Sequence, residues 1–193
     1  MKMGAIEKRF VNAVGHSRGV AEAAARRLQD VPCRPGQTYL DVGCGNGAAA
    51  AHLAAALGLD VTGIDVDPEQ IELARRASEG IRGVRFLMLD ATHLPFGDAT
   101  FDIVATNKTT HHIPTWDEAL AEMLRVLRPG GYLVYADFVL PGWLAALLRP
   151  IAGRRAGLVT RAALDRILGG RGLEVVRCGG PGVLYEAVCR KPT

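Results

Sequence analysis

Residues 40–47, LDVGCGNG, decide the fold. They join the apolar run TYLDVG at 38–43, which is typical of a buried strand, to the alanine-rich NGAAAAHLAAALG at 46–58, which favours a helix. Glycines at such a bend remove Cβ atoms and permit positive φ, so a ligand can lie directly on backbone amides. The helix start adds N–H donors and a positive dipole end that suit a carboxylate or a phosphate. This stretch alone also fits a tight turn that binds no ligand.

Strand-like apolar runs alternate with helical stretches along the rest of the chain. The expected strands are 38–43, 60–65, 84–89, 101–106 and 132–138, followed by a closing hairpin of 173–178 and 183–189. The expected helices are 5–14, 18–29, 46–58, 67–80 and 115–127. This alternation predicts an α/β domain with a largely parallel sheet. Ligands of such sheets lie where strands end, near a topological switch point.

Short signals mark the ends of the expected helices. Gly58 is placed as a C-cap, Asp67 as an N-cap before a proline, and Thr115 with Glu118 as a capping box. The RPGG at 128–131 is expected to end the helix that Thr115 opens.

Composition and charge describe an ordinary globular chain of 193 residues, 49% hydrophobic and 22% charged, with a net charge of +3. One domain is expected. The cysteines are Cys33, Cys44, Cys178 and Cys189, and they form no CxxC pair, so neither a disulfide framework nor a metal site is predicted. The N-terminus lacks the apolar core of a signal peptide, and no apolar run reaches the ~18 residues of a spanning helix, so a cytoplasmic location is expected. Without a basic stripe or interleaved aromatic residues, no nucleic-acid partner is expected.

Two aspartates follow strands close to the glycine-rich bend. Asp65 closes the strand at 60–65, where an acidic side chain can accept hydrogen bonds from both ribose hydroxyls of an adenosine ligand. Asp90 follows the strand at 84–89 and reaches the same sheet edge, where it can accept the adenine amino group. Either aspartate alone also fits a turn or a cap. Together with the glycine loop they predict a nucleoside-shaped site.

The spacing of the glycines narrows the nucleoside ligand. Gly43-x-Gly45-x-Gly47, followed by alanine, departs from the GxGxxG of dinucleotide enzymes and argues against a nicotinamide cofactor. The Walker pattern GxxxxGK[ST] is absent from the sequence, which excludes ATP binding by that route.

Four stretches, in order, resemble successive motifs of the class I S-adenosylmethionine-dependent methyltransferases. They are LDVGCGNG (40–47), GIDVDPEQIELAR (63–75), LDATHLPFGDATFDIVATN (89–107) and LRVLRPGGYLVYADF (124–138). The resemblance covers residues 37–138, particularly to the branch that includes quinone-biosynthesis C-methyltransferases. It implies S-adenosyl-L-methionine as cofactor and a three-layer Rossmann-like sandwich, whose seven-stranded sheet is mostly parallel with the last strand antiparallel. The segments outside 37–138 match only loosely, and in this family they choose the substrate.

The resemblance also assigns cofactor-binding residues. They are Asp41, Gly43, Cys44, Gly45, Asn46, Gly47, Asp65, Val66, Asp90, Ala91 and Asn107. The glycine loop would lie against the methionine and ribose portions, with Asp41 helping to hold the loop. Asp65 would bind the ribose hydroxyls, Val66 would pack on adenine, and residues 90–91 would meet the adenine edge. Asn107 would offer its backbone to the methionine ammonium.

His111 and His112 follow the expected strand at 101–106 and are the candidate catalytic residues. Methyl transfer needs alignment above all, but an acceptor of high pKa gains from a general base. Packing at a helix entry is the alternative role for both histidines. The same stretch reads NKTTHHI instead of the [DN]PP[YF] of enzymes that methylate exocyclic amino groups, which favours a small-molecule acceptor.

The unusual segment of the chain is FVLPGWLAALLRPIAGRRAG, 138–157, and residues 142–155 within it are the candidates for membrane contact. Trp143, Leu144, Leu147, Leu148 and Ile151 would share one face of a short helix, and arginines follow at or beyond its end. A helix packed on the domain is one interpretation. The others are a lid over an apolar substrate and a patch that makes peripheral contact with a membrane surface.

These observations predict one class I methyltransferase domain over residues 1–193. Helices at 1–36 would lie over the site, 37–138 would be the cofactor-binding core, 139–170 a lid-like helical segment and 171–193 the closing hairpin. The expected function is transfer of a methyl group to a small apolar or amphipathic molecule by in-line displacement. A non-catalytic cofactor-binding or partner-binding protein of the same fold is the alternative, and a nucleotide-dependent oxidoreductase comes third. The methylated atom and the oligomeric state stay open.

Overall fold

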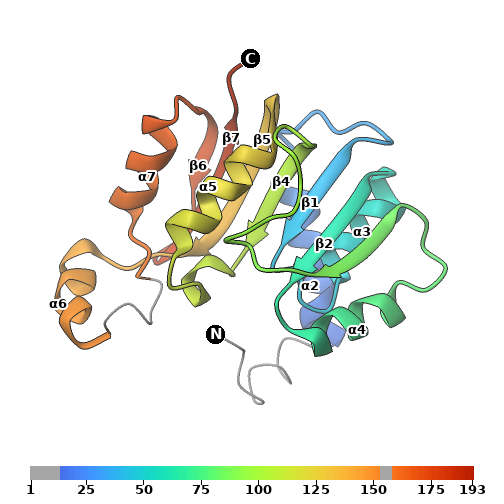
Figure 1. The fold of residues 1–193 in the computed structure, drawn as a ribbon, viewed down its shortest axis with the longest axis horizontal. Helices are drawn as coiled ribbons and strands as arrows, with labels where there is room; N and C mark the ends of the chain where they lie inside the picture. The colour runs from blue at the N-terminus through green and yellow to red at the C-terminus, as the bar shows by residue number, and fades with distance from the viewer. Residues whose placement is uncertain (1–13, 153–157) are drawn as a thin grey trace.

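A computed structural model describes residues 14–152 and 158–193, and it shows a twisted sheet with helices on both faces (Figure 1). The strands are β1 Thr38–Val42, β2 Asp60–Asp65, β3 Val84–Met88, β4 Phe101–Asn107, β5 Leu127–Phe138, β6 Glu174–Gly179 and β7 Leu184–Arg190. Their order across the sheet is β3-β2-β1-β4-β5-β7-β6. Strand β7 runs antiparallel to both of its neighbours, and the other strand pairs are parallel. The predicted α/β class and the antiparallel last strand are confirmed.

The helices are α2 Val14–Arg27, α3 Ala48–Leu57, α4 Pro68–Ala77, α5 Trp116–Val126, α6 Gly142–Ala152 and α7 Arg161–Gly170, with a short 3₁₀ turn, η1, at Thr110–His112. Apolar side chains alternate along the buried strands, so each face of the sheet has its own core. Leu40 of β1 packs in the cluster that α5 and α7 cover, whereas Tyr39 packs in the cluster beneath α2, α3 and α4. This period of two is what a sheet buried on both faces requires.

The order of the strands fixes where a ligand can bind. The chain proceeds outward from β1 through β2 to β3, and then returns to place β4 on the other side of β1. The carboxyl ends of β1 and β4 therefore open a crevice between two crossovers that leave in opposite directions.

Most helix and strand ends agree with the sequence, and the exceptions have local causes. Gly58 is the predicted left-handed C-cap, and the Asp67 side chain accepts a hydrogen bond from the amide of Glu69 as predicted. The capping box at Thr115 is wrong: its ψ of 52° takes it out of extended geometry, and its side chain makes no cap hydrogen bond. The strand expected at 132–138 starts earlier: β5 already begins at Leu127, with an irregular register between β5 and Phe101–Ile103 of β4.

Two of the expected helices begin at a different residue than predicted. The helix expected at 46–58 begins at Ala48, because Asn46 and Gly47 belong to the glycine loop and Gly47 has a φ of 77°. The helix expected at 18–29 begins earlier, at Val14. The helix expected at 5–14 falls, except for Val14, outside the described residues.

The segment 139–170 contains two different helices. Helix α7 packs on the sheet through Leu164 and Leu168, which are buried in the core. Helix α6 projects beyond the sheet (Figure 1), and two of its large side chains, Trp143 and Leu147, are 71% and 62% exposed. Within the described part of the chain, no helix is both long enough and apolar enough to span a bilayer.

Candidate functional site

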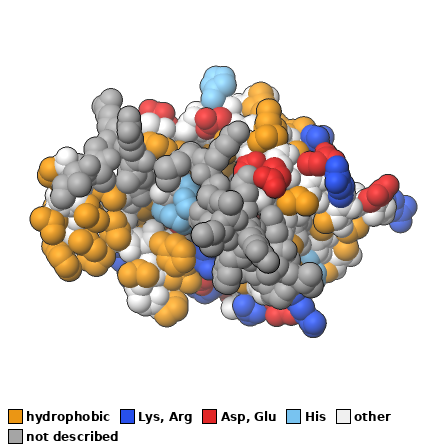
Figure 2. All heavy atoms as spheres, turned by 90° about the horizontal axis from the view of Figure 1, so that it is seen from below, with side chains coloured by type: hydrophobic (Ala, Val, Ile, Leu, Met, Phe, Trp, Pro, Cys, Tyr) orange, Lys and Arg blue, Asp and Glu red, His pale blue; other side chains and the backbone are white. Residues whose placement is uncertain are grey.

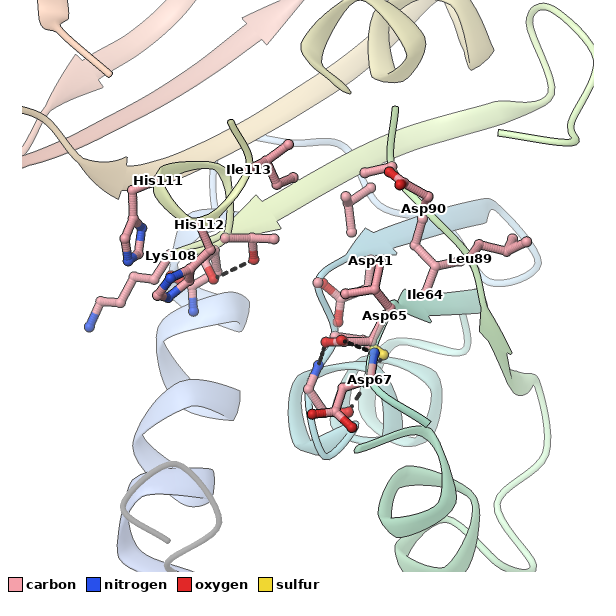
Figure 3. A pocket seen from close by; sticks show the side chains of 18 of the residues that line it. Asp41, Ile64, Asp65, Asp67, Leu89, Asp90, Lys108, His111, His112 and Ile113 are labelled. Atoms are coloured by element: carbon pink, nitrogen blue, oxygen red, sulfur yellow. Dashed lines mark hydrogen bonds between the residues drawn. The ribbon is translucent and has the colours of Figure 1, made fainter. Parts of the chain in front are cut away.

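The carboxyl ends of β1, β2, β3 and β4 border a cavity of about 460 Å³ (Figure 3). Its lining includes Asp41, Gly43, Cys44, Gly45, Asn46, Asp65, Val66, Asp90, Ala91, Asn107, His111 and His112. All the site residues singled out from the sequence therefore meet there, except Gly47. Val20 of α2 also lines the cavity, so part of the N-terminal segment contributes to it.

The glycine loop needs its glycines for two reasons. Gly43, Gly45 and Gly47 all have positive φ, at 75°, 52° and 77°. A Cβ at Gly43 would lie 2.1 Å from Thr109 Oγ1, and one at Gly47 would lie 2.7 Å from the Phe86 ring, so both positions are closed by packing. At Gly45 the nearest atom would be Oε1 of Gln70, at 3.8 Å. The backbone at Gly45 is thus bare without being crowded by protein, which suits a ligand that lies on it.

Asp65 ties the end of β2 to this loop. One carboxylate oxygen accepts from the Gly45 amide at 3.0 Å, and the other accepts from the Asp67 amide at 2.9 Å. Burial raises the pKa of Asp65, although these two hydrogen bonds oppose the shift. Each oxygen keeps a lone pair for a further donor, so the carboxylate can hold the loop and accept hydroxyl groups at once.

Two buried oxygen atoms at the cavity have no hydrogen-bond partner among the described residues. They are Oδ2 of Asp41 and Oδ1 of Asn107, at the ends of the adjacent strands β1 and β4. A buried acceptor left without a donor costs roughly 1–3 kcal/mol. Burial, together with the charge of Asp65, raises the pKa of Asp41 to about 7. A donor that reaches either oxygen would remove this cost at that position.

His111 is held by a carboxylate that was not predicted from the sequence. Its Nδ1 lies 2.5 Å from Oδ1 of Asp137, at the end of β5. Asp137 is fully buried and also accepts hydrogen bonds from the backbone amides of Thr110, His111 and Phe138 and from the Thr110 hydroxyl. Burial would raise the pKa of Asp137, but the hydrogen bonds from His111 and Thr110 outweigh it and hold that pKa below its usual range. With Nδ1 engaged, Nε2 is the ring nitrogen of His111 that can take a proton.

The surroundings of His111 are aromatic and cationic. Its ring lies 3.9 Å from the ring of His112 and 5.4 Å, edge to face, from that of Phe138, measured between centroids. Nζ of Lys108 lies 5.3 Å from the centre of the Phe138 ring. Lys108, His111, His112 and Phe138 all line the cavity.

The remaining predicted contacts differ in exposure. Val66 is 45% exposed and Ala91 is buried. The Asp90 carboxylate accepts from both the amide and the hydroxyl of Thr92, at 2.9 and 2.7 Å. It therefore caps its own loop while it borders the cavity.

Sequence reasoning missed Asp137 and Lys108. Asp137 lies in YADF, at the end of the strand expected at 132–138. An acidic residue at the carboxyl end of a strand was a signal that could have identified it, and this strand pairs with β4. Lys108 lies in the same NKTTHHI stretch that drew attention to the histidines, but nothing in the sequence shows that its backbone turns at that point.

Comparison with protein families identifies a match over residues 40–135, to the methyltransferase domain. Methyltransferase GfsG of Streptomyces halstedii is 39% identical over 155 residues, which are 77% of this chain and 56% of that protein. The 2-methyl-6-phytyl-1,4-hydroquinone methyltransferase of Synechocystis sp. is 40% identical over 104 residues, 54% of this chain and 33% of that protein. The chain thus spans about half the length, or less, of these curated relatives.

Solved structures resemble the whole fold. A SAM-dependent methyltransferase from Aquifex aeolicus superposes with a TM-score of 0.74 over 98% of this chain and 99% of that one, at 22% identity. At that identity the likeness concerns the fold. Together with the matching domain and the relatives, it confirms the expected resemblance: this chain belongs to the class I S-adenosylmethionine-dependent methyltransferase family.

Proposed function

We propose that this chain binds S-adenosyl-L-methionine and transfers its methyl group to a small apolar or amphipathic molecule by in-line displacement. The observation that carries the proposal is the cavity at the ends of β1 to β4, where a bare glycine loop, buried carboxylates and a carboxylate-bound histidine meet. The named relatives support a small-molecule acceptor, since one of them is a hydroquinone methyltransferase.

The chain's own residues fit the cofactor group by group. The unpartnered oxygens of Asp41 and Asn107 suit the ammonium of the methionine portion. Asp65 keeps lone pairs for the ribose hydroxyls, and Val66 offers exposed apolar surface to the adenine. When bound, the cofactor supplies a methyl group that is attached to a positively charged sulfur. The sulfur is the leaving group and keeps the electron pair of the broken bond. The protein has to place the acceptor in line with that bond.

His111 is the proposed general base. Its Nδ1–H is held by the buried Asp137 carboxylate, which fixes the tautomer that leaves Nε2 able to accept a proton. Asp137 is a positioning residue, because it acts through the imidazole. His112 packs on the His111 ring and narrows the same wall of the cavity.

The acceptor is proposed to meet helix α6. Phe138 lines the cavity and is 41% exposed, and Trp143 and Leu147 on α6 are more exposed still. Hydrophobic side chains gather at the end of the molecule where α6 lies (Figure 2). We propose that this apolar face covers the body of the acceptor. Contact of the same face with a membrane surface is the second proposal, since lipophilic acceptors reside there.

Incubation with methyl-labelled cofactor and a panel of small molecules tests the function. Label should appear in a phenolic or otherwise amphipathic acceptor together with S-adenosylhomocysteine. The variant His111→Gln should bind S-adenosylhomocysteine as the parent does, yet turn over roughly 10² to 10⁴ times more slowly. A protein that binds the cofactor but labels no acceptor would instead be a binding protein of the same fold. Binding of NADH in place of S-adenosylhomocysteine would indicate an oxidoreductase.

A further inference from the structure

The charged groups of the cavity are divided between its two sides (Figure 3). The carboxylates of Asp41, Asp65, Asp67 and Asp90 come from the ends of β1, β2 and β3. Lys108, His111 and His112 come from the segment that follows β4. The cofactor brings its own positive charges, and the acidic side suits them. The basic side is then left to the carboxylate of the cofactor and to the methyl acceptor.

Lys108 is placed on the basic side by a backbone conformation that costs energy. Its φ is 53°, in the left-handed region that side chains other than glycine rarely adopt. Its amide donates a 2.7 Å hydrogen bond to the carbonyl of Ala136 on β5, which fixes the turn. Its ammonium lies over the Phe138 ring, and within the described residues it forms no ion pair with a carboxylate. Lys108 is exposed, so its ammonium stands at the edge of the cavity in contact with solvent, with no carboxylate partner among the residues that the structure describes.

The groups around Lys108 limit which chemical classes of acceptor can bind beside its ammonium. Asp137 is the carboxylate on this side, and its oxygens already accept from Thr110, His111 and Phe138. A cationic amine would be repelled by Lys108 and has no carboxylate to meet there. A carboxylic acid would suit the cation but is already ionised at neutral pH, so the His111–Asp137 pair would have nothing to remove. A cation beside a base instead fits a hydroxyl that loses its proton and whose oxyanion is then stabilised.

We propose, on the basis of the proposed function, that Lys108 selects an acceptor with an acidic hydroxyl, a phenol or an enol, on an apolar body. The hydroxyl proton passes to Nε2 of His111, and the ammonium of Lys108 stabilises the oxyanion. The oxygen forms the new bond to the methyl carbon as the bond from that carbon to the sulfonium sulfur breaks, with its electron pair staying on the sulfur of S-adenosylhomocysteine. Phe138 stands edge to face with His111 and beneath Lys108, and it offers a flat apolar surface to an aromatic ring. Lys108 is therefore a specificity-determining residue.

A spectroscopic probe tests this without turnover. The probe is 4-nitrophenol carrying a hexyl chain beside the hydroxyl, because its phenolate absorbs visible light and its neutral form does not. It is titrated with pH in complex with the protein and S-adenosylhomocysteine, which cannot donate a methyl group. An ammonium within a few ångströms lowers the pKa of a phenol by roughly one unit or more. The bound probe should therefore ionise at a pH lower by that amount in the parent protein than in Lys108→Met.

Matched variants separate charge from fold. Lys108→Arg keeps the cation and should keep the shift in the pKa of the probe. Arg82→Met removes an exposed cation in the loop before β3, at the opposite edge of the sheet, and should leave the probe unaffected. Turnover should follow the same order: 4-hexylphenol should be methylated at least tenfold more slowly by Lys108→Met than by the parent or by the arginine variant.

Three results would overturn the proposal. The probe could fail to bind the parent complex, it could ionise at the same pH in parent and Lys108→Met, or decanoic acid could be methylated in preference to 4-hexylphenol by parent and His111→Gln alike. Calorimetry with S-adenosylhomocysteine distinguishes this failure from failure of the proposed function. If the parent binds S-adenosylhomocysteine but leaves the pKa of the probe unchanged, only the proposed acceptor class is wrong. If the parent does not bind S-adenosylhomocysteine, the proposed function is wrong as well.

Discussion

At the scale of single residues, the left-handed backbone of Lys108 offers a test of why a lysine stands there. Left-handed geometry costs an L-residue roughly 1–2 kcal/mol, whereas glycine adopts it freely but loses more entropy on folding. The free energy of unfolding of Lys108→Gly should therefore equal that of the parent or exceed it by up to about 1 kcal/mol. Its turnover of 4-hexylphenol should nevertheless fall at least tenfold.

Ala99 is the matched control, because its φ is also 53° and it lies in the turn before β4. Ala99→Gly should show the same small stability change with no loss of turnover. Unfolding in urea, followed by circular dichroism, measures the first quantity, and initial rates measure the second. Full activity in Lys108→Gly would show that the backbone, and not the ammonium, is what the site needs.

Asp41 predicts a dependence of stability on pH. Its pKa is raised from 3.8 to about 7, so the folded state keeps the proton while the unfolded state loses it. Between about pH 4 and 7 the folded state binds more protons, and the free energy of unfolding should fall as pH rises, by up to about 4 kcal/mol from this group. Asp41→Asn should flatten that slope and stabilise the protein without ligand at pH 8. It should also weaken binding of S-adenosylhomocysteine, since the ammonium loses its carboxylate.

Urea unfolding of parent and Asp41→Asn across this pH range checks the sign. A slope that is the same in both proteins would mean that Asp41 is ionised in the folded state throughout.

Some residues of the site could be predicted and others could not. The glycines and Asp65 were predictable because positive φ and a strand-end carboxylate leave a local mark in the sequence. The contact between His111 and Asp137 joins positions 26 apart and depends on the pairing of β4 with β5, which fixes both side chains at one edge. The oxygen of Asp41 is without a partner because no donor from the described residues lies within hydrogen-bond distance, and a local sequence pattern does not show such an absence.

At the scale of elements, helix α6 carries large apolar side chains that do not pack against the rest of the described structure. Trp143 and Leu147 are 71% and 62% exposed, so replacing both with aspartate should leave the free energy of unfolding nearly unchanged. If these side chains cover an apolar acceptor, losing them removes roughly 1.5–3 kcal/mol of contact for each one fully buried. Turnover of 4-hexylphenol should then fall at least tenfold, while affinity for S-adenosylhomocysteine stays the same.

Val175→Asp is the control for this pair of substitutions. Val175 is 56% exposed on β6, the edge strand of the sheet, and it does not line the cavity. Its substitution should leave turnover as in the parent. Unchanged turnover in the Trp143 and Leu147 double variant would contradict the contact of α6 with the acceptor. The second proposal, that α6 contacts a membrane surface, is then tested by measuring binding to lipid vesicles.

The element boundaries show where local signals are sufficient. Gly58 and Asp67 cap their helices as predicted, because each acts within its own turn. Thr115 carries the same kind of signal, but its ψ of 52° is not the extended geometry of an N-cap residue and its side chain makes no cap hydrogen bond. The early start of β5 at Leu127 depends on pairing with a strand that is distant in the sequence. The pairing of Leu127 with Phe101 extends the strand through residues that would otherwise form a turn.

At the scale of the whole molecule, the order of the strands explains why residues far apart in sequence share one cavity. Strands β1 and β4 are parallel, but the winding of the chain reverses after β3 and places β4 on the other side of β1. This reversal brings the glycine loop that follows β1 to the same cavity as the segment 107–112 that follows β4. The acidic and basic sides of the cavity follow from this reversal. The alternation of strands and helices predicted a largely parallel sheet with a ligand site at its strand ends, whereas the division of charge in the cavity, the exposure of α6 and its separation from α7 required the structure.

The central claim is that S-adenosylmethionine lies on the glycine loop with its ribose held by Asp65. Calorimetric titration of S-adenosylhomocysteine into the parent protein and into Asp65→Ala tests it most directly. We expect one site in the parent and an affinity at least tenfold lower in the variant, because hydrogen bonds to a charged group are worth roughly 1.5–3 kcal/mol. Equal affinity in the two proteins, or no binding to the parent, would contradict it.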